Sequence, residues 1–152
     1  MIDVNLRPPY DTAEVALELL AKADIAKLNI EELDKVAQWS GFSELPEDER
    51  IRMLYEKYAF DYLIVTYGSE GAKVFDGKQI HRHPGYKVKT ADSVGAGDAF
   101  LSGFLYKMLN ENAAVPDALD FACAAGALVA SRDGATPDYN LEDIEMIKKT
   151  IN

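Results

Sequence analysis

The chain has 152 residues, of which 48% are hydrophobic, and its 16 Lys and Arg against 26 Asp and Glu give a formal net charge of -10 at pH 7. This length and composition suit one folded domain and exclude a disordered chain. The negative charge opposes binding to nucleic acid or to an anionic membrane, and the single Cys123 excludes an internal disulfide.

We therefore expect a cytoplasmic protein with no nucleic-acid or membrane partner. The opening residues lack the pattern of a secretory leader, and no apolar stretch reaches the length of a membrane-spanning helix. A small anionic ligand such as a nucleotide is still compatible with this charge, because backbone amides at a helix N-terminus bind phosphate without a basic surface.

The first part of the chain alternates strand and helix patterns. Met1–Asn5 resembles the end of a strand that is broken at Pro8-Pro9, and Asp11 with Glu14 resembles a capping box that opens a helix. The pattern then predicts a strand over 23–29, a helix over 31–38 and a helix from 46 to 58.

The second part predicts a hairpin followed by helices. A buried strand over 62–67 closes at Gly68, a further strand follows Gly71, and Asp76-Gly77 is a hairpin turn that leads to a strand over 78–83. After a loop and a glycine-rich turn we expect a helix over 97–110 and two more helices.

This order of elements predicts an α/β fold with a mostly parallel, Rossmann-like sheet, helices on both faces in three layers, and one inserted antiparallel hairpin. Ligands of such sheets bind outside the carboxyl ends of the strands. The predicted elements place Asn5, Asn29, Gly68 and the Gly95 turn at that edge.

The strongest chemical motif is Gly95-Ala96-Gly97-Asp98, which lies between an extended segment and an apolar helix. The glycines permit close backbone approach, and the helix start presents unpaired amides with a partial positive charge. Asp98 could accept the proton of a substrate hydroxyl while the amides of Gly95, Ala96 and Gly97 stabilise a transferred phosphoryl group. In isolation, the same four residues fit an acidic residue that merely stabilises a helix start.

The longer segment Asp92-Ser93-Val94-Gly95-Ala96-Gly97-Asp98-Ala99-Phe100 resembles the signature D-[ST]-x-G-A-G-D-x-F of the ribokinase-like, or PfkB, carbohydrate kinase family. The resemblance runs through the chain in the family's order. It implies a ribokinase-like fold, residues 1–152 as the ATP-binding and phosphoryl-transfer portion, and ATP-dependent phosphorylation of a sugar with Asp98 as the base. ATP and Mg²⁺ are the implied cofactors.

Two companion motifs lie near predicted strand ends. Asp3-Val4-Asn5-Leu6-Arg7 is similar to the D-x-N-x-R element of fructokinases, which implies fructose as the substrate and Arg7 as a contact to it. Lys27–Glu32 resembles the family's N-x-x-E element, which implies Asn29 at the nucleotide phosphates and Glu32 as the residue that helps hold magnesium, an ion that prefers oxygen ligands. Without the resemblance, Asn29 is a helix cap and Glu32 a solvated side chain.

Further motifs concern the nucleotide. Thr66, Gly68 and Gly71 match the family's T-x-G-x-x-G nucleotide loop, although alone they fit an ordinary hairpin turn. Phe121–Ala127 resembles the small-residue helix that borders the adenine site, with Cys123 where the family often has Asn or His. The alternative for Cys123 is a buried structural thiol.

The resemblance also implies a site for a monovalent cation, K⁺, which many members of the family hold by carbonyl oxygens near the signature. In this chain the corresponding positions are Asp92, Val94 and Gly134, the last in a Gly134-Ala135 turn. Backbone carbonyls leave no residue-type pattern, so this site follows from the resemblance alone.

Members of the family are longer than this chain, and their N-terminal half, which supplies most sugar contacts, has no counterpart here. We expect a homo-oligomer or association with the missing portion through an exposed sheet edge beside Ile2–Asn5. Two alternatives stay open: a nucleoside kinase of the same family, and a non-catalytic module that binds nucleotide without transferring phosphate.

Two other groups of residues receive no function. His81 and His83 share one face of a predicted strand, but no third ligand accompanies them, so a solvated face is predicted. The aromatic residues near helix and strand ends are predicted to pack in the core, a set that comprises Trp39, Tyr55, Tyr58, Phe60, Tyr62 and Tyr67.

Overall fold

The computed structural model describes residues 1–9 and 11–149, and the chain divides into two compact units. The first unit comprises Met1–Tyr67 and Lys73–Ile80, and the second comprises Gly68–Ala72 and the chain from His81 onward.

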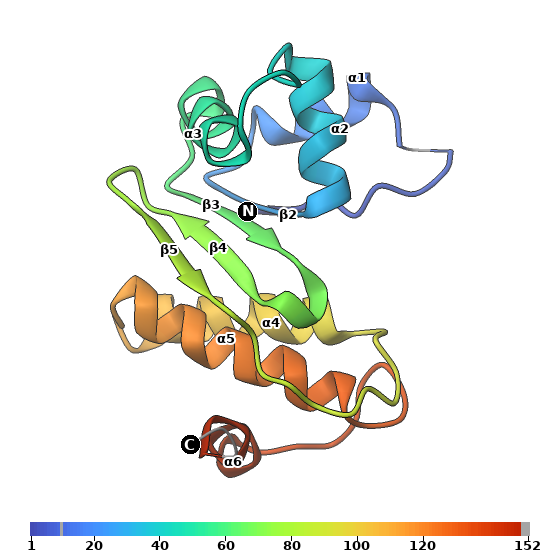
Figure 1. The fold of residues 1–152 in the computed structure, drawn as a ribbon, viewed down its shortest axis with the longest axis vertical. Coiled ribbons are helices and arrows are strands. Elements are labelled where there is room, and N and C mark those ends of the chain that lie inside the picture. Colours follow the sequence, from blue (N-terminus) through green and yellow to red (C-terminus); the bar gives the residue numbers. More distant parts are fainter. Residues whose placement is uncertain (10, 150–152) are drawn as a thin grey trace. The chain divides into compact units, whose positions relative to one another are not determined.

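Five strands form one sheet in the order β1-β2-β3-β4-β5 (Figure 1). Their bounds are Ile2–Asp3 for β1, Ile25–Asn29 for β2, Tyr62–Thr66 for β3, Ala72–Phe75 for β4 and Ile80–His83 for β5. The pairs β1–β2 and β2–β3 are parallel. The strands β4 and β5 are joined through the predicted turn, where the Asp76 carboxylate accepts hydrogen bonds from the amides of Lys78 and Gln79. The predicted parallel sheet and its hairpin are thus confirmed.

The helices follow the predicted order. They are α1 (Ala13–Leu20), α2 (Ile30–Ser40), α3 (Glu47–Tyr58), a 3₁₀ turn (Gly68–Glu70), α4 (Ala96–Leu105), α5 (Val115–Ala130) and α6 (Leu141–Lys149). The predicted helix over 97–110 changes to a π-helix at Tyr106–Asn110. None of the helices in the described part of the chain is long and apolar enough to cross a membrane.

The core of the first unit lies between β2, β3 and the helices α2 and α3, which lie side by side in Figure 1. Alternate strand residues point to this core because side chains alternate between the faces of a strand. The strands contribute Ala26, Leu28, Leu63 and Val65, and the helices contribute Leu33, Val36, Ala37, Ile51 and Leu54. Most of the aromatic residues predicted to pack in the core do so, namely Trp39, Tyr55, Tyr58, Phe60 and Tyr67.

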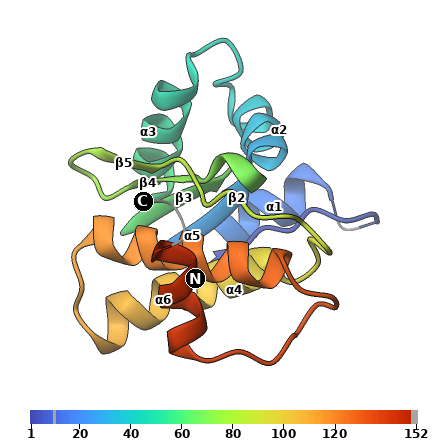
Figure 2. The same ribbon diagram turned by 60° about the horizontal axis from the view of Figure 1, so that its bottom comes forward.

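The second unit is built on close packing of α4 against α5, with α6 beside α5 (Figure 2). Small residues permit this approach. A Cβ atom on Gly126 would lie 3.1 Å from the carbonyl oxygen of Ala96, and one on Gly103 would lie 3.3 Å from Phe121. The small-residue character of α5 therefore has a structural reason as well as a resemblance to the family.

The predicted capping box of α1 is wrong in its residues. The N-cap is Thr12, whose hydroxyl oxygen accepts a hydrogen bond from the amide of Val15 at 3.5 Å, and not Asp11. The helix begins at Ala13, so the side chain one position before it is the one that reaches the first-turn amides.

Candidate active site

The start of α4 depends on a glycine. Gly95 is the N-cap residue and has φ 81°, in the left-handed region that glycine adopts without steric cost. A Cβ atom at Gly95 would overlap the carbonyl oxygen of Ala135. The turn over 94–97 is therefore pressed against the Gly134-Ala135 turn, a contact within the second unit that only glycine permits.

The first turn of α4 presents free hydrogen-bond donors. Gly95 provides no side-chain cap, and the amides of Gly95, Gly97 and Asp98 donate to no other group in the described residues. The amide of Ala96 donates to the carbonyl of Ser93 at 3.3 Å. Because Gly97 and Asp98 are exposed, this helix start offers solvent two unpaired amides and the positive end of the helix dipole.

Asp98 stands beside these donors and has no partner in the described part of the chain. Its carboxylate is exposed and accepts no hydrogen bond from another described residue. A free carboxylate next to unpaired amides suits a base that works beside an anion-binding site.

The segment before the turn is anchored on the end of α5. The amides of Ala91 and Asp92 donate to the carbonyl of Ala130 at 2.9 and 3.3 Å, and the amide of Val94 donates to the Asp92 carboxylate at 2.9 Å. The structure thus brings Asp92, Val94 and the signature turn to one end of α5. The Gly134-Ala135 turn, which follows α5, completes this group.

The predicted nucleotide loop, Gly68–Gly71, is a 3₁₀ turn followed by a glycine with φ 88°. A Cβ atom on Gly71 would overlap the main chain at His83 and Gly85. Gly71 is therefore required by a close approach of two backbone segments, whereas a Cβ atom on Gly68 would meet no atom within 4 Å.

In the first unit, Asn29 and Glu32 form a capping box at the start of α2. The Asn29 side chain accepts from the amide of Glu32 at 2.9 Å, and the Glu32 carboxylate accepts from the amide of Asn29 at 2.8 Å. The second carboxylate oxygen of Glu32 accepts from the amide of Leu6 at 3.0 Å. Glu32 is only 6% exposed, so the solvated alternative is wrong for it, while the helix-cap alternative for Asn29 describes its observed contact.

The capping box also joins the fructokinase-like segment to α2 through Leu6. The neighbouring Arg7 is exposed, and its Nε donates to the Asn5 side chain at 3.2 Å. Thr66 is the register partner of Asn29, and its hydroxyl donates to the carbonyl of Leu28 at 3.4 Å. Asn29, Glu32, Thr66 and the loop that carries Arg7 therefore gather at the carboxyl ends of β1–β3, the edge at which ligands of parallel sheets bind.

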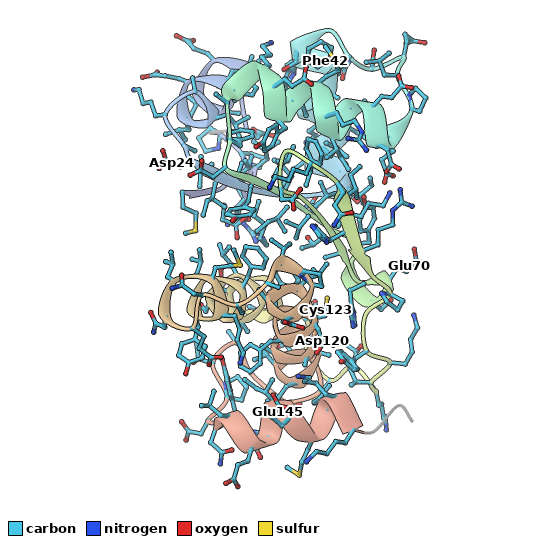
Figure 3. The ribbon with its side chains drawn as sticks, turned by 90° about the vertical axis from the view of Figure 1, so that its left-hand side faces the viewer. Asp24, Phe42, Glu70, Asp120, Cys123 and Glu145 are labelled. Carbon is cyan, nitrogen blue, oxygen red and sulfur yellow. The ribbon has the colours of Figure 1, made fainter. Side chains whose placement is uncertain are left out.

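Cys123 is buried within α5 (Figure 3). Burial, followed by the negative charge of Asp120, raises the pKa of its thiol to about 12. The thiol is therefore protonated at neutral pH, which matches the buried-thiol alternative.

A polar cluster around Asp120 of α5 was not found by sequence reasoning. Asp120 accepts hydrogen bonds from His83 at 3.1 Å and from the Tyr86 hydroxyl, and it pairs with Lys148 of α6 at 3.1 Å. The prediction of a solvated strand face is therefore wrong for His83, whose side chain is 19% exposed. The available signal was Asp120, a charged residue beyond the first turn of a helix that is otherwise apolar after Asp117.

The residues present fit magnesium only as part of a nucleotide complex. Among the described residues, no group of three or more His, Cys, Asp or Glu side chains is placed to hold a metal ion. Each carboxylate oxygen of Glu32 accepts one hydrogen bond from a backbone amide and keeps a further lone pair. These lone pairs suit contact with magnesium through water, because magnesium commonly keeps several waters. The unpaired amides at α4 likewise fit the phosphates of a nucleotide.

Comparison with known proteins supports the sequence interpretation. Residues 1–142 match the pfkB family carbohydrate kinase. The chain belongs to the PfkB family. An ATP-dependent ribose-1-phosphate kinase from Halopiger xanaduensis is 38% identical over 122 residues, which cover 78% of this chain and 36% of that protein. A fructokinase from Escherichia coli is 33% identical over 144 residues, covering 88% and 45%.

Solved structures show that this PfkB chain has the ribokinase-like fold. The ribokinase of Thermotoga maritima has a TM-score of 0.75 at 24% identity, over 91% of this chain and 45% of its own. A fructokinase double mutant of Vibrio cholerae O395, solved with fructose, ADP and a potassium ion, has a TM-score of 0.79 at 26% identity over 95% and 48%. The chain thus spans less than half the length of the curated relatives it matches.

Proposed function

We propose that this PfkB chain forms the ATP-binding and phosphoryl-transfer portion of a sugar kinase, with fructose as the sugar. One observation carries the proposal: the family signature coincides with a helix start that has unpaired amides and a free, exposed carboxylate. At the start of α2, by contrast, the cap and the acidic residue of the first turn both bond to backbone amides.

In the proposed reaction, Asp98 accepts the proton of a sugar hydroxyl as its oxygen bonds to the γ-phosphorus, and the bond to the ADP oxygen breaks. The amides of Gly95, Gly97 and Asp98 stabilise the charge on the transferred group. Magnesium, when bound with the nucleotide, neutralises phosphate charge. Positioning and charge stabilisation supply most of the catalysis in such transfers, so a preformed turn pressed against Ala135 suits the task.

The companion residues have supporting roles in this proposal. Asn29 and Glu32 serve the phosphates and magnesium through water, and the exposed Arg7 contacts the sugar or the transferred phosphate through its guanidinium. Thr66, Gly68, Gly71 and α5 around Cys123 surround the nucleotide. A K⁺ ion near Asp92, Val94 and Gly134 is the remaining expectation, and it draws support from the potassium ion of the Vibrio cholerae fructokinase.

Fructose is preferred because the segment Asp3–Arg7 is fructokinase-like and because fructokinases recur among the relatives. A sugar phosphate is the competing substrate, since an ATP-dependent ribose-1-phosphate kinase is among them at 38% identity. Both substrates present a hydroxyl to a base and differ in charge. Turnover of the intact gene product with fructose, ribose 1-phosphate, ribose and nucleosides distinguishes them.

The mechanism is tested with Asp98→Asn, which removes the base and keeps its shape. We expect ATP-dependent turnover to fall ~10²–10⁴-fold. Asp117→Asn is the matched control, because Asp117 occupies the same third position of a helix, α5, and is also exposed at a start without a side-chain cap. Its turnover should change little, since an exposed first-turn charge contributes about 0.3–1 kcal/mol to the helix.

Calorimetric measurement of Mg·ADP binding separates nucleotide binding from phosphoryl transfer. Asp98→Asn should bind Mg·ADP with nearly unchanged affinity while transfer is lost. If Asp98→Asn retained wild-type turnover, Asp98 would not be the base. If the unmodified protein bound Mg·ADP and transferred phosphate to none of the acceptors, a non-catalytic nucleotide-binding module would replace the kinase.

A further inference from the structure

The nucleotide loop is held by a neighbouring segment of the second unit, His83–Lys87, which we name the brace. The main chain of the brace at His83 and Gly85 approaches Gly71 so closely that a Cβ atom there would overlap it. Near its other end, the Lys87 ammonium donates to the carbonyl of Ser69 at 3.0 Å. The position of the loop therefore depends on the position of the brace.

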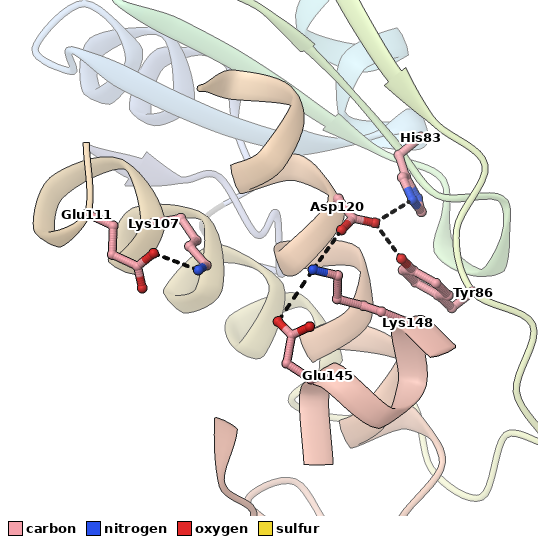
Figure 4. Close-up of polar contacts among 7 residues, drawn as sticks. All are labelled: His83, Tyr86, Lys107, Glu111, Asp120, Glu145 and Lys148. Atoms are coloured by element: carbon pink, nitrogen blue, oxygen red, sulfur yellow. Dashed lines mark hydrogen bonds and ion pairs between the residues drawn. The ribbon is translucent and has the colours of Figure 1, made fainter. Parts of the chain in front are cut away.

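The brace is in turn held on α5 by one carboxylate. The same oxygen of Asp120 accepts hydrogen bonds from His83 Nε2, at 3.1 Å, and from the Tyr86 hydroxyl (Figure 4). The other ring nitrogen of His83 accepts from the amide of Gly85 at 3.1 Å. This hydrogen-bond network assigns the ring proton to Nε2, which donates it to Asp120.

The second oxygen of Asp120 has a different partner. It pairs with Lys148 of α6, which also contacts Glu145 of its own helix. Burial alone would raise the pKa of Asp120, but the hydrogen bonds from Tyr86 and Lys148 and the charge of Lys148 outweigh it, so the pKa lies below its usual value. Asp120 is thus ionised at neutral pH, with one oxygen for the brace and the other for α6.

Asp120 also lies one helical turn before Cys123, on the same side of α5 (Figure 3). The segment around Cys123 resembles the family's helix that borders the adenine site. A carboxylate at Asp120 therefore links two parts of the nucleotide site: the α5 surface around Cys123 and, through the brace, the Gly68–Gly71 loop.

We propose that Asp120 is a positioning residue for nucleotide binding, which sets the distance between the Gly68–Gly71 loop and α5 through His83 and Tyr86. The proposal rests on the proposed function, because the nucleotide role of the loop comes from the family. It assigns a role in nucleotide affinity to the cluster of Asp120, His83 and Tyr86.

The test compares Asp120→Asn and Tyr86→Phe with Lys148→Met in the intact gene product. The first two weaken contacts to the brace, and the third removes the ion pairs of Lys148 with Asp120 and Glu145 while it leaves the contacts of Asp120 to His83 and Tyr86 in place. We expect the Kd for Mg·ADP and the KM for ATP to rise about tenfold in the first two, the effect of losing one hydrogen bond to a charged group. The KM for the sugar and kcat should stay unchanged, and Lys148→Met should lower thermal stability without changing the Kd.

Tyr86→Phe keeps the ring that packs on the core around Phe121, so it folds even if Asp120→Asn does not. If both variants lowered the melting temperature and left the Kd at its wild-type value, as a merely structural role requires, the inference would be wrong while the kinase proposal stood. If Lys148→Met raised the Kd for Mg·ADP as much as Asp120→Asn and Tyr86→Phe do, the weaker binding would result from a change in the packing of α6. The inference would then also be wrong. A wild-type protein that bound no Mg·ADP would overturn the kinase proposal and this inference together.

Discussion

The helices α2 and α4 both carry an acidic residue at their third position, Glu32 and Asp98, yet they begin in opposite ways. In α2, Asn29 and Glu32 bond reciprocally to first-turn amides, and the second oxygen of Glu32 ties down Leu6. In α4, Gly95 provides no cap and Asp98 bonds to no described residue.

The difference shows how the same local pattern satisfies its own backbone donors in one place and leaves them open in another. A helix start that satisfies its own donors gains about 1 kcal/mol from the cap. A start that leaves them open gives up that stabilisation and presents an anion site to solvent. Substitutions at the two helix starts distinguish a structural role for α2 from a functional role for α4.

The largest expected loss of stability is that of Gly95→Ala. The new Cβ atom overlaps the carbonyl of Ala135 and adds strain at φ 81°, and together these effects lower the free energy of unfolding by about 2–5 kcal/mol. Gly41→Ala is the matched control, because Gly41 has φ 83° and no atom within 4 Å of the added Cβ, so only about 1–2 kcal/mol is lost. Urea denaturation measures both. Equal losses would show that the signature turn is not pressed against the Gly134-Ala135 turn.

The capping box of α2 is tested by Glu32→Gln. The amide replaces a buried charged acceptor of two backbone hydrogen bonds, so the free energy of unfolding should fall by about 1.5–3 kcal/mol.

Asp98→Asn supplies the comparison, because the Asp98 carboxylate has no hydrogen bond to lose among the described residues. The free energy of unfolding should then fall by less than about 1 kcal/mol, the contribution of a first-turn charge. If urea denaturation found the larger loss for Asp98→Asn, the assignment of α2 as structural and α4 as functional would be reversed.

The start of α3 offers a smaller, pH-dependent test. Glu47, in its first turn, accepts hydrogen bonds from Lys73 and Tyr67. Burial alone would raise the pKa of Glu47, but these bonds and the charge of Lys73 outweigh it and lower the pKa.

The sign of the stability effect follows from this lowered pKa. Glu47 contributes stability above its unfolded-state pKa of 4.5, and the contribution is lost as the pH falls through the lower folded-state pKa. Thermal melts from pH 7 down to the acid transition should show a weaker pH dependence in Glu47→Gln than in the wild type below pH 4.5. The same slope in both proteins would show that Glu47 is not stabilised by its partners.

Much of the fold was predictable because its signals are local. The turn at Asp76-Gly77, the strand over 62–67 and the helix after Gly95 each depend on residues a few positions apart. The start of α1 shows the limit of such signals, since Asp11 and Thr12 are both good capping residues and only the observed helix boundary selects Thr12.

Burial and long-range contacts could not be predicted in the same way. Glu32 was open to interpretation as a solvated side chain, but its bond to Leu6 joins residues 26 positions apart and buries the carboxylate. His83 and Asp120 are 37 positions apart, and no sequence pattern around either residue indicates that the other is its partner. Hydrogen-bond partners so far apart leave no periodicity to detect.

The sequence by itself determined the order of strands and helices and the family signature that contains Asp98, because the hydrophobic period and the residue types of a turn are properties of short segments. Only the tertiary structure decided which acidic side chains accept hydrogen bonds from backbone amides and which accept none from the described residues. That distinction depends on which distant backbone amides reach each carboxylate, so Glu32 became part of the framework while Asp98 stayed open beside unpaired donors.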